Sequence, residues 1–186
     1  ILYREAEFES EVVIPAAFSS IVAYSVFCLS LPAQLRWTPL FGPGLGFSLG
    51  SFVELIPLGF LGIVLTLAGF VYIRVFYGTH DLFRKLPIKR HFRPALGAGL
   101  AGLVAILLFS LTGEDRTVLA VLSAGYGVIQ DALRPGDPSV LLPIGALLIV
   151  AIGKIITTSL TIGSGGSGGV FGPSMVIGGS LGGAVG

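Results

Sequence analysis

The chain has 186 residues, of which 53% are hydrophobic and only 11% are charged. Soluble domains carry about 25% charged residues, so this composition indicates a membrane protein and excludes a disordered chain. The formal net charge of +1 excludes a basic nucleic-acid-binding protein, and the single cysteine, Cys28, excludes an internal disulfide framework and a cysteine-based zinc site.

Long uncharged runs divide the chain into candidate membrane spans. Several of them are long enough for a spanning helix, which needs roughly 20 apolar residues. A backbone in hydrocarbon must satisfy its own hydrogen bonds, and the runs lack the alternation of barrel strands, so helices are expected. The predicted fold is all-α and polytopic, with helices near residues 8–30, 52–77, 94–111, 117–132, 139–161 and 172–186.

A short basic segment separates the second and third predicted spans. It contains Arg84, Lys85, Lys89, Arg90 and Arg93. Positive residues in short loops stay on the cytoplasmic side, so residues 78–93 are predicted to be cytoplasmic and to contact lipid head groups. By alternation, the loop 32–51 faces outward. Its Pro39, Pro43 and several glycines forbid a continuous helix there.

The last quarter of the chain carries the strongest functional signal. Residues 163–174 read Gly-Ser-Gly-Gly-Ser-Gly-Gly-Val-Phe-Gly-Pro-Ser. Each glycine costs a helix about 1 kcal/mol relative to alanine, so the apolar run 140–162 is predicted to stop here. A new helix is predicted to start near Gly172. Pro173 then lies in its first turn, where a missing N–H costs nothing.

A helix broken at membrane depth must be buried in protein or line a wet cavity. The free N–H groups and the positive dipole end of the new helix attract anions, and transporters use half-helices in this way. We therefore predict an anion site made from backbone amides. Its anion-binding residues are Gly169, Val170, Phe171 and Gly172, and Gly168 and Pro173 form the helix start. No catalytic residue, metal ligand or cofactor is predicted, so we expect no enzyme activity.

Lys154 is the only charged residue between residue 138 and the end of the sequence. Two interpretations stay open: it attracts anions over a long range, or it pairs with an acid or extends to the membrane interface. The hydroxyl residues after it are expected to form hydrogen bonds across helices, with pore lining as the minority alternative. They are Thr157, Thr158, Ser159 and Thr161.

The glycine-rich segment resembles the third signature of the CLC chloride channel and transporter family, Gly-x-Phe-x-Pro. Gly169, Phe171 and Pro173 match that pattern. The resemblance covers the entire chain, residues 1–186, as part of a single CLC-like transmembrane domain. It implies tilted, broken and re-entrant helices, and chloride bound by the amides of Val170 and Phe171. It also implies a homodimer with one pathway per subunit.

The same resemblance implies that the substrate is chloride and that the protein is integral to a lipid bilayer. A plasma membrane is expected, and the compact loops favour a bacterial inner membrane. Transport would be passive, as in a channel, or coupled to protons, as in an exchanger. The sequence does not decide between these two.

Other elements of the family are missing from this chain. The Gly-Ser-Gly-x-Pro element and the Gly-(Lys/Arg)-Glu-Gly-Pro element with its gating glutamate do not occur, and all tyrosines precede the signature. The chain is therefore expected to hold one wall of a chloride pathway, with the first-half filter motifs and the C-terminal helices absent.

The alternative functions are another anion carrier with a half-helix site and a non-conducting membrane scaffold. A dinucleotide site at the Gly-x-Gly-x-x-Gly match that begins at Gly163 is excluded, because no acidic residue follows Asp137.

Overall fold

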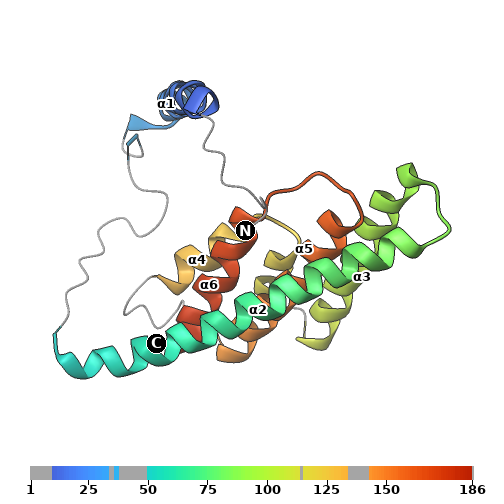
Figure 1. Ribbon diagram of the computed structural model, residues 1–186. Helices are drawn as coiled ribbons and strands as arrows, with labels where there is room; N and C mark the ends of the chain where they lie inside the picture. Colours follow the sequence, from blue (N-terminus) through green and yellow to red (C-terminus); the bar gives the residue numbers. More distant parts are fainter. Residues whose placement is uncertain (1–9, 34–35, 38–49, 114, 134–142, 186) are drawn as a thin grey trace. The chain divides into compact units, whose positions relative to one another are not determined.

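The computed structural model describes residues 10–33, 36–37, 50–113, 115–133 and 143–185 (Figure 1). The chain divides into two compact units, residues 1–43 and residues 44–186, and each is described by itself.

The first unit contributes one helix, α1 (Ser10–Ser30), which confirms the helix predicted near 8–30. Its apolar part is long enough to cross a membrane. The last carbonyls of a helix have no partner within it. Here Arg36 supplies donors: its Nε lies 3.0 Å from the Leu31 oxygen and its Nη2 lies 3.2 Å from the Leu29 oxygen. Most of the loop predicted at 32–51 lies outside the described residues.

The second unit is built from long apolar helices and short 3₁₀ segments. The long helices are α2 (Leu55–Lys85), α3 (Arg93–Leu111), α5 (Ile144–Gly163) and α6 (Phe171–Val185). The short elements are η2 (Phe52–Glu54), η3 (Arg90–Phe92), η4 (Arg116–Val121) and α4 (Tyr126–Ala132). Among the described residues of both units, four helices are long and apolar enough to span a membrane: α1, α2, α3 and α5. Helix α6 is apolar but shorter. The protein is therefore an all-α, integral membrane protein.

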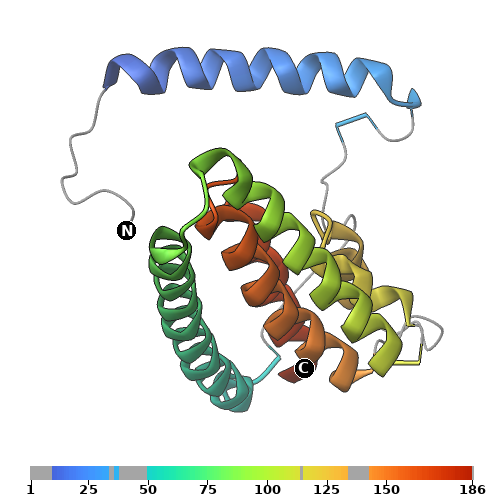
Figure 2. The same ribbon diagram turned by 90° about the vertical axis from the view of Figure 1, so that its right-hand side faces the viewer.

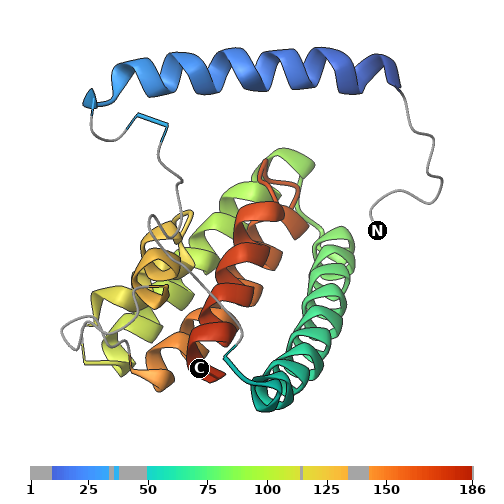
Figure 3. The same cartoon turned by 90° about the vertical axis from the view of Figure 1, so that its left-hand side faces the viewer.

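Helix α5 lies at the centre of this unit. It contacts α2, α3, η4 and α6, and more than half of its span is buried. Figure 2 shows α5 between α2 and α3, and Figure 3 shows α6 in front, returning alongside α5 in the opposite direction. The central position of α5 and the break that follows it bring the predicted site residues to one end of the bundle.

Two glycines permit the close crossings of α5. A Cβ added to Gly97 of α3 would lie 2.5 Å from the Leu160 carbonyl oxygen. A Cβ added to Gly153 would lie 2.8 Å from the side chains of Leu108 and Val121. Small residues at helix crossings are the usual device for close packing in membranes.

We expect Gly97→Ala to lower the free energy of unfolding by about 1–3 kcal/mol, because the new methyl group has no room against a backbone oxygen. Gly99→Ala on the same helix is the matched control, since its Cβ would meet nothing within 4 Å. Unfolding of the purified protein in detergent measures both. Equal stability of the two variants would contradict the close α3–α5 approach.

Two predicted elements differ from the structure. A single helix over 117–132 is wrong: η4 ends at Val121, α4 begins at Tyr126, and Gly125 between them has a φ of 73°. That left-handed conformation favours glycine and interrupts a helix. Helix α2 also continues to Lys85, past the expected end near 77. It stops only where Leu86 becomes extended before Pro87, as residues before proline do.

Candidate functional site

The predicted break between the last two helices is confirmed. Helix α5 ends at Gly163 and α6 begins at Phe171. The turn after α5 requires glycine at two positions. Gly165 has a φ of 94°, and a Cβ on Gly166 would lie 2.6 Å from the Thr161 oxygen. The glycine-rich sequence is thus needed for the shape of this coil.

The start of α6 leaves three backbone donors available. Its first hydrogen bond runs from the Ser174 N–H to the Val170 oxygen, at 3.0 Å. In the part of the chain that the structure describes, no oxygen accepts a hydrogen bond from the N–H of Val170, Phe171 or Gly172. No acidic side chain lies in the first turn to take these donors. Such a helix start can accept an anion.

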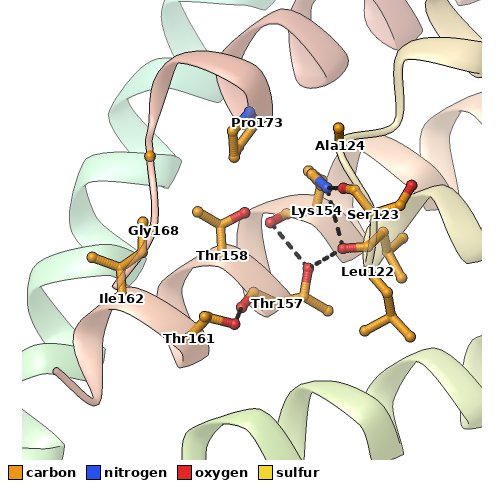
Figure 4. Close-up of a pocket in the computed structure, with 12 residues that line it drawn as sticks. Leu122, Ser123, Ala124, Lys154, Thr157, Thr158, Thr161, Ile162, Gly168 and Pro173 are labelled. Atoms are coloured by element: carbon orange, nitrogen blue, oxygen red, sulfur yellow. Dashed lines mark hydrogen bonds between the residues drawn. The ribbon is translucent and has the colours of Figure 1, made fainter. Parts of the chain in front are cut away.

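A cavity of about 270 Å³ lies beside this helix start. Three segments form its wall: the connection between η4 and α4, the middle and end of α5, and the coil with the first turn of α6 (Figure 4). Of the predicted site residues, Lys154, Gly168, Gly169 and Pro173 line it. Val170, Phe171 and Gly172 lie next to these residues in the chain but are not part of the wall.

The Phe171 side chain is not enclosed. It is 74% exposed within the described structure, although it is the central residue of the sequence signature. The phenyl ring therefore does not pack within the described structure. The backbone of Phe171, and not its ring, forms the helix start.

Lys154 is held inside the bundle. It is only 3% exposed, and its Nζ donates hydrogen bonds to the carbonyl oxygens of Ala120 (3.1 Å), Val121 (3.3 Å) and Ser123. The interpretation in which it extends to the interface or pairs with an acid is wrong for the residues that are described. The ammonium group instead caps the end of η4, where carbonyls have no helical partner.

The hydroxyl residues after Lys154 donate hydrogen bonds to different elements. Thr157 donates to the Val121 oxygen at 2.7 Å, which ties α5 to η4. Ser159 and Thr161 donate to carbonyls of their own helix, those of Ile155 and Thr157. The expected bonding between elements is thus confirmed for Thr157 and wrong for Ser159 and Thr161.

Sequence reasoning missed the part of the wall contributed by residues 121–124. These residues receive the bonds of Lys154 and Thr157 and face the cavity. The available signal was Lys154 itself, since a lone charge in an apolar run needs buried partners. Its partners lie 31 to 34 positions away, so the sequence alone could not select them.

Together, the fold and the site define a polytopic helical membrane protein in which a helix is interrupted beside a cavity lined in part by a lysine and three threonines. The family model described as "Voltage gated chloride channel" matches residues 1–186, and the chain belongs to that family.

Curated relatives agree with this assignment. The chain is 30% identical over 134 residues to the "H(+)/Cl(-) exchange transporter ClcA" of Yersinia pestis, covering 68% of this chain and 24% of that protein. It is 30% identical over 121 residues to the "Voltage-gated ClC-type chloride channel ClcB" of Citrobacter koseri, covering 65% of this chain and 25% of that protein. The chain thus spans about a quarter of the length of these relatives. No solved structure matches it.

Proposed function

We propose that the protein containing this chain transports chloride across a membrane and that the start of α6 forms one wall of the pathway. The observation that carries the proposal is the set of unpartnered amides at Val170, Phe171 and Gly172, next to a cavity with a buried lysine. Family membership supports it, as do relatives named as a chloride channel and as a chloride–proton exchanger.

The chemistry of this wall suits an ion that must enter and leave. Backbone amides carry partial charges, so they bind an anion without holding it as tightly as a bare cation in low dielectric would. The charge of Lys154 is shared with three carbonyls and adds attraction at the cavity wall. Chloride is the substrate, and since no bond is made or broken, the transport step uses no cofactor.

The anion contacts are assigned residue by residue. We place chloride against the amides of Val170 and Phe171, with Gly169 and Gly172 allowing close approach of the backbone. Gly168 and Pro173 set the direction of the chain at the helix start.

The same proposal covers assembly and location. We infer a homodimer in which each subunit has its own pathway, placed in the plasma membrane, which in a bacterium is the inner membrane. Bacterial relatives of both transport classes support this location. They match this chain at the same identity, so the mode of transport, channel or exchanger, is left to experiment.

The test is chloride efflux from liposomes that contain the intact protein. Efflux above that of protein-free vesicles is expected when valinomycin carries the compensating potassium. Proton uptake during efflux identifies an exchanger, and its absence identifies a channel. Efflux of a different anion would favour another half-helix carrier. No efflux of any anion, with no anomalous bromide signal beside residues 169–172, would overturn the proposal in favour of a scaffold.

A further inference from the structure

One hydroxyl that lines the cavity has no hydrogen-bond partner within the described structure. Thr158 is 7% exposed and lines the cavity beside Lys154 and Pro173. A threonine in a helix usually donates to a carbonyl three or four residues before it. Thr158 makes no such bond, and no other described residue partners its hydroxyl. Because the Thr158 residue lines the cavity, its unpartnered hydroxyl is available to a ligand there.

The neighbouring hydroxyls make the contrast plain. Thr157 and Thr161 line the same cavity, but their O–H groups donate to the oxygens of Val121 and Thr157 at 2.7 and 2.8 Å. Thr158 alone of these three presents an uncommitted donor to the cavity. In Figure 4 the Thr158 side chain lies below Pro173, with its hydroxyl oxygen on the side of Lys154.

Three features of the wall thus favour the same kind of ligand. The uncommitted O–H is a hydrogen-bond donor, the ammonium of Lys154 is positive, and the first turn of α6 carries the positive end of a helix dipole. Among the residues that the structure describes, no acidic side chain lines the cavity. A cation would find no negatively charged side chain among these residues. A small anion would find a hydrogen-bond donor and a positive electrostatic potential.

We infer that the Thr158 hydroxyl donates a hydrogen bond to the transported anion inside the cavity, where the neighbouring start of α6 adds the favourable potential of its helix dipole. The inference rests on the proposed chloride transport and adds a side-chain contact to it. The backbone amides bind any anion that fits, and the hydroxyl adds a single directed donor. Thr158 therefore contributes to the choice between chloride and anions that accept hydrogen bonds poorly, such as thiocyanate.

The test compares three variants of the intact protein. Thr158→Val removes the hydroxyl and keeps the shape, Thr158→Ser keeps the hydroxyl, and Thr161→Val removes a hydroxyl that its own helix already occupies. Chloride binding is measured by isothermal titration, and chloride and thiocyanate efflux are measured from liposomes. We expect Thr158→Val to weaken chloride binding about tenfold, equivalent to about 1.4 kcal/mol, and to shift selectivity toward thiocyanate. Thr158→Ser and Thr161→Val should bind like the unmodified protein.

The outcomes separate this inference from the proposed function. If the unmodified protein neither binds nor transports chloride, the proposed function fails. If it does both and Thr158→Val matches it, only the Thr158 subsite is overturned. Equal losses in Thr158→Val and Thr161→Val would also overturn it, because they would reflect packing of α5. Should Thr158→Val fail to fold, Thr158→Ala is used with the same controls and the same criteria.

Discussion

Replacing Lys154 with methionine is expected to lower the free energy of unfolding by about 3 kcal/mol. Methionine fills much of the same space but donates nothing, so the carbonyls of Ala120, Val121 and Ser123 lose a shared donor inside the bundle. Leaving buried polar groups unsatisfied costs about 1–3 kcal/mol for each group. The end of η4, which Lys154 caps, should be the first region to loosen.

Hydrogen exchange of the amides in residues 116–125 measures the local effect, and unfolding in detergent measures the global one. Lys85→Met is the matched control, because Lys85 is exposed at the end of α2. It removes the same charge without breaking a buried hydrogen bond. The capping role of Lys154 is contradicted if Lys154→Met exchanges and unfolds like Lys85→Met.

Local rules predicted most of the helices. Charge-free runs identified α1, α3 and α5, because a span needs uninterrupted apolar length. The density of glycine after residue 162, with Pro173, predicted both the end of α5 and the new start of α6. These features depend on neighbours in the chain, and such neighbours are visible in a sequence.

The wall of the cavity depended on distant contacts and could not be predicted in the same way. The break between η4 and α4 follows from the left-handed Gly125, where a Cβ would come within 2.7 Å of the Val176 side chain from α6. Sequence patterning predicted one continuous helix over residues 117–132 because it contains no information on that contact. For the same reason it grouped Thr157, Thr158 and Thr161 together, although Thr157 alone of these donates to η4.

The role of the backbone amides of α6 in anion binding can be tested by a substitution at Phe171, because the helix does not need that side chain. We expect Phe171→Pro to weaken chloride binding about tenfold or more, because proline removes one backbone N–H from the proposed site, and a hydrogen bond to a charged group is worth about 1.5–3 kcal/mol. The fold should persist, since proline is tolerated at the first position of a helix. The Phe171 N–H has no acceptor in the described structure, so no existing hydrogen bond is lost.

Phe171→Ala is the control that isolates the backbone. It removes the phenyl ring, which is 74% exposed, and keeps the N–H. Chloride titration and liposome efflux of both variants should show a large loss for proline and a small one for alanine. If the two variants lose chloride binding equally, the ring carries the interaction. If neither loses any, the anion binds elsewhere. Either result would remove the physical basis on which the helix start was assigned to the chloride pathway.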